Sequence, residues 1–229
     1  MSDFATEFEK IKAELDALRL ENEALKKALA PPPAPVAPAP SDNPYQMLKG
    51  IGQTLYNTQI ASDIWRGTPL EAINELKPDF AGKVGEEFIR QLCVASGIAN
   101  ESTGDVNSKD GTYDQKIGAS LKKTEIKTAR LGGGKYQHET LKSSGYDYIL
   151  FVDIHPQGGY LTVVSPFAMD SKHPITGTRP SLRKGTTDVY KWDFAENHLN
   201  KFITAGMCLK FDKTTPLTTI ADFLRAKIV

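Results

Sequence analysis

The chain of 229 residues predicts an α/β fold, because helix-like and strand-like segments alternate along most of its length. Three observations carry this prediction. Residues 80–96 form an amphipathic run that stops before Gly97, which is typical of a helix and its C-terminal cap. Residues 111–117 and 120–129 read as two strands joined by a turn at Gly118. The apolar run 145–155 predicts a buried strand.

Residues 1–30 carry a heptad repeat, which predicts a parallel coiled coil. Apolar side chains recur in steps of three and four, and Asn22 falls at a core position, where asparagine favours a parallel two-stranded register. Acidic residues at g face basic residues at e of a partner helix. The positions are Phe8, Leu15, Asn22 and Leu29 at a, Phe4, Ile11, Leu18 and Leu25 at d, Glu7, Glu14 and Glu21 at g, and Lys12, Arg19 and Lys26 at e. We expect a homodimer through this helix.

Residues 31–44 form a Pro/Ala-rich linker, and residues 45–229 are predicted to form the globular domain. Proline lacks an N–H to donate, so the linker should adopt extended polyproline II and span about 40 Å. A helix is expected over residues 44–65. A short helix is expected over residues 68–76, with Thr68 as its N-cap.

Further elements follow the apolar strand. Gly158 and Gly159 predict a turn, after which residues 160–164 read as another strand. Residues 188–194 also read as a strand. Two late helices are predicted, over residues 195–203 and residues 217–227.

The strand pair carries the most informative chemistry, because Asp114 precedes Glu125-Ile126-Lys127 by ten intervening residues. Alternation along a strand puts Glu125 and Lys127 on one face, and a hairpin can bring Asp114 alongside. Two carboxylates suit Mg²⁺, and a lysine beside them can orient a water or offset charge on a phosphate. Taken alone, the same string is also typical of a solvated strand face.

The order of a helix, a strand with Asp114, a strand with Glu-x-Lys, a short helix and a buried strand resembles the PD-(D/E)xK nuclease superfamily. Within it, residues 136–139 followed by 145–156 are similar to the segment after the catalytic strand of many type II restriction endonucleases. The likeness extends from about Phe80 to Pro166. It departs from the pattern at Tyr113, where a proline is usual.

This resemblance implies a restriction-endonuclease-like mixed sheet flanked by helices and metal-dependent hydrolysis of phosphodiester bonds. Asp114 and Glu125 would hold Mg²⁺, for which Mn²⁺ can substitute, with the carbonyl of Ile126 as a further ligand. Lys127 would position the attacking water. These residues form the catalytic set that the resemblance assigns.

The superfamily often adds a glutamate from a helix, and both Glu86 and Glu87 are available. The helical wheel does not choose between them, but the family's pattern of a glutamate three residues before an aliphatic favours Glu86, ahead of Ile89. The alternative is a solvated helix face, on which Glu86 pairs with Arg90.

Contacts to DNA are expected from two segments. Gln137 and His138 follow the catalytic strand and would assist the site or contact phosphate. The polar segment 171–188 would read bases, because arginines bond guanine edges in pairs and lysines bond phosphates. Its basic residues are Arg179, Arg183 and Lys184. The alternative for both segments is a solvated loop.

Composition narrows the class of protein. With 28 basic and 28 acidic residues the net charge is zero, which counts against a protein that coats nucleic acid by charge alone. No apolar run approaches a membrane span, and the acidic N-terminus does not resemble a signal peptide, so we expect a cytoplasmic protein without membrane contact. Cys93 and Cys208 lie in apolar contexts and should be reduced core residues.

The resemblance to the PD-(D/E)xK superfamily favours a Mg²⁺-dependent endonuclease of double-stranded DNA, of the type II restriction class. The heptad repeat favours a symmetric dimer, which suits the two-fold symmetry of duplex DNA. If the globular domains also pair, two dimer contacts would produce a tetramer. A repair, recombination or phage nuclease of the same fold is the alternative within the enzyme class. A non-catalytic DNA-binding or scaffold protein is the alternative outside it, and for such a protein the acidic pair would be dispensable.

Overall fold

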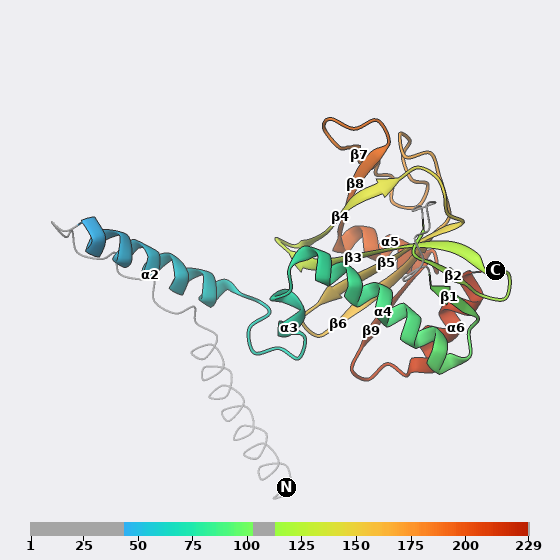
Figure 1. Ribbon diagram of the computed structural model, residues 1–229, viewed down its shortest axis with the longest axis horizontal. Coiled ribbons are helices and arrows are strands. Elements are labelled where there is room, and N and C mark those ends of the chain that lie inside the picture. Colours follow the sequence, from blue (N-terminus) through green and yellow to red (C-terminus); the bar gives the residue numbers. More distant parts are fainter. Residues whose placement is uncertain (1–43, 103–112, 229) are drawn as a thin grey trace, which may run out of the picture. The chain divides into compact units, whose positions relative to one another are not determined.

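The computed structural model describes residues 44–102 and 113–228 (Figure 1). The predicted coiled coil and the linker up to residue 43 lie outside this part of the chain. Two compact units divide the sequence, Met1–Asp63 and Ile64–Val229. The first contains helix α2 (Pro44–Ser62), which was predicted as the opening helix of the globular domain and which takes Pro44 from the predicted linker.

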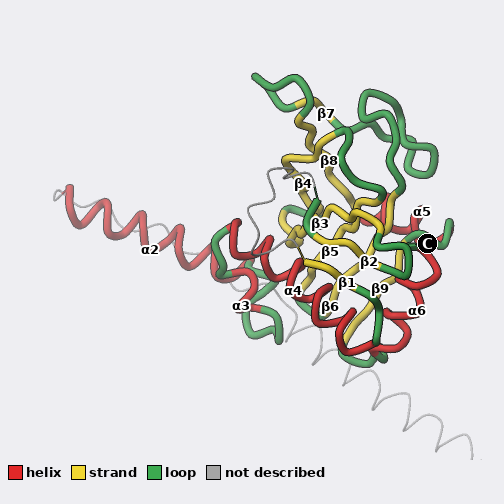
Figure 2. Tube along the Cα trace, turned by 45° about the vertical axis from the view of Figure 1, so that its right-hand side comes forward, coloured by secondary structure: helices red, strands yellow, loops and turns green. Residues whose placement is uncertain are grey.

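The second unit is an α/β structure built on a mixed sheet, as Figure 2 shows by colour. Within the described residues the sheet has nine strands in the order β7-β8-β4-β3-β5-β6-β9, with β2 beside β3 and β1 beside β2. Strands β3 and β5 are parallel and the other pairs are antiparallel. The strands are β1 (Asn100–Ser102), β2 (Gln115–Ile117), β3 (Lys122–Gly132), β4 (Lys135–Lys142), β5 (Tyr148–His155), β6 (Gly158–Val164), β7 (Ser181–Leu182), β8 (Val189–Ala195) and β9 (Cys208–Asp212).

Helices cover both faces of this sheet. One face packs against α4 (Pro78–Ser96) and α6 (Leu217–Lys227), and the core there includes Ile89 and Leu224. The other face packs against α5 (Glu196–Thr204), whose Phe202 joins an aromatic cluster with Phe151, Trp192 and Phe194. The short helix α3 (Glu71–Asn74) precedes α4. The predicted α/β class is therefore confirmed.

The predicted end of one helix and one predicted turn are confirmed. Helix α4 ends at Gly97, whose φ of 65° is the left-handed conformation that glycine adopts without strain. The turn between β2 and β3 uses Gly118 at φ 83°. Gly133 and Gly134, at φ 55° and 76°, form the two-residue turn between β3 and β4.

Two local predictions about helices are wrong. Thr68 is not an N-cap, because its hydroxyl donates to the carbonyl of Trp65 and α3 begins only at Glu71. The short helix expected between the catalytic strand and the apolar strand is strand β4 instead. Its residues Tyr136 and His138 alternate with exposed neighbours and are buried against the aromatic cluster, a period of two that favours a strand.

The turn predicted at Gly158 and Gly159 is also misplaced, since both residues lie inside β6. A Cβ at Gly158 would come within 2.2 Å of the carbonyl oxygen of Phe211, and one at Gly159 within 2.6 Å of the Phe211 ring. These glycines therefore allow β9 to approach β6 closely rather than forming a turn.

Candidate active site

Side chains along strand β3 alternate between a face that packs against helices and a face that carries Glu125 and Lys127. Ile126, Thr128 and Arg130 lie on the face that meets α3 and α4. Ile126 joins the core with Ile89, and Thr128 donates to the carbonyl of Gly82 at 3.1 Å. Arg130 donates to three carbonyls around α3, those of Ile73, Asn74 and Leu76. Glu125 and Lys127 lie on the opposite face, as the sequence predicted.

One edge of β3 is open in the middle of the strand. Strand β5 pairs along one edge from Thr124 to Arg130, so β2 and β4 must share the other edge. On that edge β2 reaches only Thr124, and β4 begins to pair only at Leu131. The stretch between them has no strand partner within the described residues, so its backbone groups can bind something else.

Asp114 binds that open edge. Its Oδ2 accepts a hydrogen bond of 2.6 Å from the N–H of Ile126, and its own N–H donates to the carbonyl of Thr124 at 3.1 Å. The carboxylate predicted to join Glu125 and Lys127 thus reaches the strand between those two residues. The sequence prediction that a hairpin brings these three residues together is consistent with this geometry.

Glu125 and Lys127 form a close ion pair, with 2.6 Å between Oε1 and Nζ. Their side chains are 12% and 20% exposed, so the pair is shielded from water but remains reachable. A lysine held by a carboxylate in this way keeps a fixed position, and its remaining N–H groups can donate to a water or to a phosphate oxygen.

The two helix glutamates differ clearly. Glu87 accepts hydrogen bonds from Arg90 at 2.7 Å and from Gln91 at 2.7 Å, which lower its pKa to about 2. Glu86 is half-buried and interacts electrostatically with Asp114 and Lys127. The predicted alternative, in which Glu86 pairs with Arg90, is wrong because Glu87 takes that partner. Glu86 is the glutamate that faces the site.

Three carboxyl groups around Lys127 have raised pKa values, and burial is the largest cause for each. Repulsion between neighbours adds to it, because the charge of Asp114 raises the pKa of both Glu86 and Glu125. The Lys127 ammonium acts in the opposite direction on all three, and the Ile126 N–H lowers the pKa of Asp114. Such a cluster is poised to accept positive charge.

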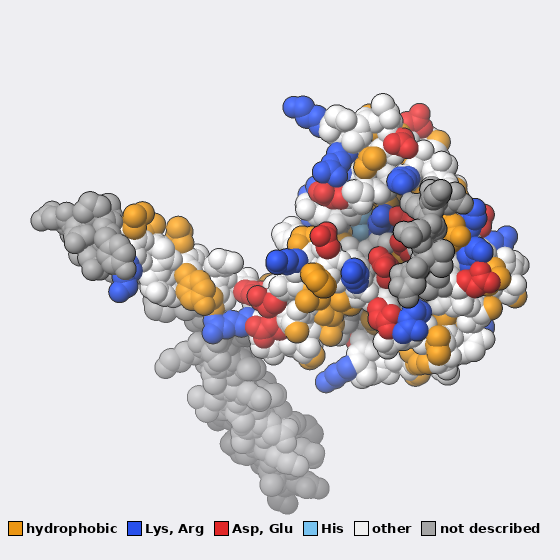
Figure 3. Space-filling view, in the orientation of Figure 1, with side chains coloured by type: hydrophobic (Ala, Val, Ile, Leu, Met, Phe, Trp, Pro, Cys, Tyr) orange, Lys and Arg blue, Asp and Glu red, His pale blue; other side chains and the backbone are white. Residues whose placement is uncertain are grey.

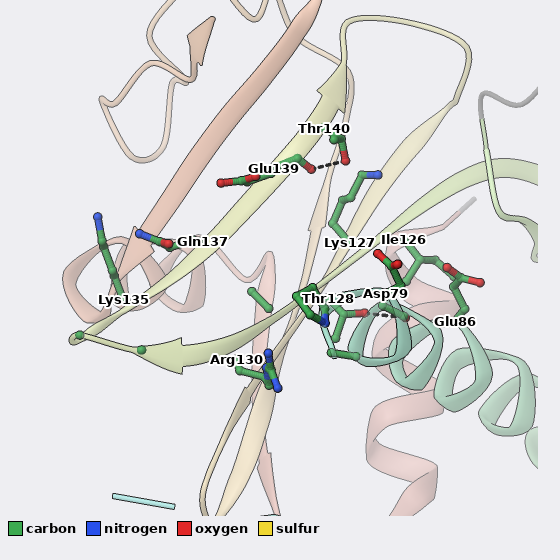
Figure 4. A pocket seen from close by; sticks show the side chains of 16 residues that line it. Asp79, Glu86, Ile126, Lys127, Thr128, Arg130, Lys135, Gln137, Glu139 and Thr140 are labelled. Carbon is green, nitrogen blue, oxygen red and sulfur yellow. Dashed lines mark hydrogen bonds between the residues drawn. The ribbon is translucent and has the colours of Figure 1, made fainter. Parts of the chain in front are cut away.

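A groove of about 750 Å³ runs beside these groups (Figure 4). Glu86, Ile126 and Lys127 lie on one side of it, and Gln137, Glu139 and Thr140 from β4 lie across from them. Asp114 and Glu125 are not among its lining residues. The groove therefore gives a ligand access to the lysine and to Glu86.

The β4 side of the groove is nearly neutral. Lys135 pairs with Asp193 of β8 at 2.7 Å, and Lys191 of β8 lies 3.7 Å from Glu139. Gln137 is exposed between Lys135 and Glu139 on this wall. Its amide is thus an uncharged polar group on the wall of the groove, and its role as a contact residue stays a prediction.

The ligand set suits a hard divalent cation. Mg²⁺ is bound by one or two carboxylates completed by waters and substrate oxygens, and Asp114 and Glu125 provide two carboxylates at one edge. The carbonyl of Ile126 faces the same edge as its N–H, since both groups of a strand residue point to one side. Within residues 44–102 and 113–228 no group of three or more His, Cys, Asp or Glu side chains is arranged to hold a metal. Oxygens from water and substrate would complete the site.

The residues predicted to contact DNA lie in different surroundings. His138 is 1% exposed and lies 2.9 Å from Asp153 beneath the aromatic cluster, so it is removed from any surface and is dropped as a contact residue. Arg179, Arg183 and Lys184 are exposed around β7, apart from the groove. On the face that Figure 3 shows, basic and acidic side chains intermingle across the globular unit.

Sequence reasoning missed two residues near the site. Gln115 of β2 is 2% exposed, and its Nε2 donates to the carbonyl of Glu86 at 2.7 Å. Lys142 at the end of β4 lowers the pKa of Glu125 by its charge. The position of Gln115 directly after Asp114 was the only available signal for it, and Lys142 offered none.

Comparisons with known proteins found no match for the chain. No family model matches the chain, and none of the curated proteins compared with it does. Among the helices of the described residues, none combines the length and apolarity that a bilayer crossing requires.

Cys93 and Cys208 are free and buried, and burial raises their pKa values to about 11 and about 12.

Proposed function

We propose that the protein is a Mg²⁺-dependent endonuclease of double-stranded DNA, a type II restriction endonuclease of the PD-(D/E)xK superfamily. The observation that carries the proposal is the proximity of Asp114, Glu125 and Lys127 at the edge of β3 between β2 and β4, with Glu86 beside them. A mixed sheet flanked by helices is consistent with the restriction-endonuclease-like fold.

Each residue has a role that follows from its surroundings. Asp114 and Glu125, with the Ile126 carbonyl, would hold the metal, and Glu86 would bind one of its waters. When bound, the metal would supply positive charge that stabilises the negative charge developing on the phosphate. Lys127, fixed by Glu125, orients the attacking water and donates to the developing negative charge. The groove admits the phosphate backbone on the Lys127 side.

Double-stranded DNA is the substrate that fits a symmetric protein best, because the two strands of a duplex are related by a two-fold axis. The predicted coiled coil would supply the homodimer. Pairing of the globular units as well would produce a tetramer. Mass measurement of the full chain and of a truncated chain beginning at Ser41 tests this part; equal subunit counts would remove the helix from the assembly.

The catalytic proposal is tested by incubating plasmids of varied sequence with the protein in Mg²⁺, in Mn²⁺ and in EDTA. Discrete metal-dependent fragments are expected, and they should disappear for Asp114→Asn and for Lys127→Ala. Glu87→Gln is the matched control, because Glu87 adjoins Glu86 but is occupied by Arg90. Cleavage that survives in both site variants would reject the proposal. Binding of DNA without any cleavage would favour the scaffold alternative, and fragments without a fixed sequence would favour a repair, recombination or phage nuclease.

A further inference from the structure

We propose that Gln115 and Thr128 are positioning residues that hold α4 at two carbonyls one helical turn apart and thereby fix Glu86 beside Asp114 and Lys127. This inference rests on the proposed nuclease function, and it explains how a helix residue becomes part of a site built on strands. The two carbonyls belong to Gly82 and Glu86.

Gln115 provides the first attachment. A buried amide is costly unless it is hydrogen-bonded, and the Nε2 group of this 2% exposed residue donates to the Glu86 carbonyl at 2.7 Å. A carbonyl has two lone pairs, so this bond adds to the ordinary helical one. Because Gln115 directly follows Asp114, the segment that carries the aspartate also holds the helix at Glu86.

Thr128 provides the second attachment. Its Oγ1 donates to the Gly82 carbonyl at 3.1 Å, a bond that Figure 4 shows as a dashed line. The neighbouring Gly85 lets the helix approach this side chain, since a Cβ there would lie 2.0 Å from the Thr128 Oγ1. The helix therefore sits directly on the strand, and a larger residue at position 85 would lift it away.

Three hydrogen bonds connect β2 with its preceding residue, β3 and α4 to one another. Asp114 joins the segment before β2 to β3 through the Ile126 N–H, Gln115 joins β2 to α4, and Thr128 joins β3 to α4. Each element is bonded to both of the others, so α4 cannot slide along its axis without breaking a bond. A shift of the helix by about 1 Å would displace the Glu86 carboxylate, and displacements of that size cost on the order of 10²-fold in rate.

The test is a double-mutant cycle on the cleavage rate of the full chain. Gln115→Met keeps the volume and removes the donor, and we expect it to lower kcat by about 10- to 100-fold with a smaller change in KM. In a Glu86→Gln background the same substitution should have little further effect, because there is no carboxylate left to position. Gln91→Met, an exposed substitution on the same helix, should leave the rate unchanged. Equal factors in both backgrounds would overturn the inference.

A second measurement does not depend on catalysis. NMR titration of the Glu86 side-chain carboxyl in the metal-free protein should give a raised pKa, which Gln115→Met returns toward its ordinary value as the carboxyl moves to solvent. Thr128→Val removes the hydroxyl at nearly constant volume and should act in the same direction, so it serves if Gln115→Met does not fold. An unchanged titration in the folded variants would refute the clamp. Absence of cleavage by the wild-type protein would refute the nuclease function, while the titration would still decide the clamp.

Discussion

His138 and Asp153 form a buried pair whose disruption should be severe and dependent on pH. Both side chains are 0% exposed, and Nε2 lies 2.9 Å from Oδ1. The imidazole packs against Phe151 and Phe194 at ring distances of 4.5 Å and 5.0 Å. His138→Leu keeps most of this packing but leaves the carboxyl of Asp153 alone among apolar rings.

The free-energy cost of His138→Leu arises because the buried carboxyl of Asp153 loses its partner. Removing one partner of a buried ion pair costs about 3–5 kcal/mol, because the remaining charge is uncompensated. Replacing both partners by apolar residues is often neutral, so the double variant His138→Leu/Asp153→Leu should recover most of the loss. For a domain with about 5–15 kcal/mol of total stability, the single variant is seriously weakened.

The loss should grow with pH. Burial raises the pKa of Asp153 and the charge of His138 lowers it, so removing the histidine raises this pKa further. A carboxyl whose folded pKa lies above its unfolded value of about 3.9 binds more protons when folded, so stability falls as pH rises from the unfolded toward the folded pKa. The penalty of His138→Leu should therefore be smaller at pH 4.5 than at pH 8.

Urea denaturation at the two pH values measures this directly, with the wild-type protein and the double variant as references. The expected result is a free-energy loss in the single variant that increases from pH 4.5 to pH 8 and is largely absent in the double variant. A loss of equal size at both pH values, or one that persists in the double variant, would refute the reasoning.

Three further predictions follow from the same geometry. Gly85→Ala should destabilise the protein by about 1–3 kcal/mol, because the new Cβ would clash with Thr128. Gly82→Ala should stabilise α4 by about 0.5–1 kcal/mol, because its Cβ would have open space around it. Urea denaturation of the two variants compares these effects. Thr140→Gly should stabilise by about 1–2 kcal/mol, because Thr140 has φ 60° at an irregularity in β4, and an unchanged midpoint would contradict the strain. In EDTA the melting temperature should fall as pH rises through the ionisation of the three carboxyls with raised pKa values, which are those of Glu86, Asp114 and Glu125. For a Kd near 1 mM, 10 mM Mg²⁺ should raise the free energy of unfolding of the wild type by about 1.4 kcal/mol, as calorimetry would show. Asp114→Asn should show no such gain.

The parts of the structure that the sequence predicted well are those set by local periodicity. Helix α6 was predicted at its observed limits, and β8 and α5 were each within a residue. The alternation that placed Glu125 and Lys127 together required only the geometry of one strand. These features depend on near neighbours in the chain, which is the information that a single sequence provides.

The errors have a common origin in contacts between distant residues. The glycines of β6 looked like a turn because their partner, Phe211, lies far along the chain. Strand β4 was missed because its burial depends on an aromatic cluster assembled from β5, β8 and α5. His138 was placed in a loop for the same reason. The hydrogen bond from Gln115 to the Glu86 carbonyl joins residues 29 positions apart, so no local pattern in the sequence indicated it.

The two-faced character of β3 has a consequence for how the chain finds its fold. If β3 paired with β5 one residue out of step, Glu125 and Lys127 would be forced under α4 and Ile126 would turn outward. The cost of burying the charges of Glu125 and Lys127 thus disfavours the wrong register.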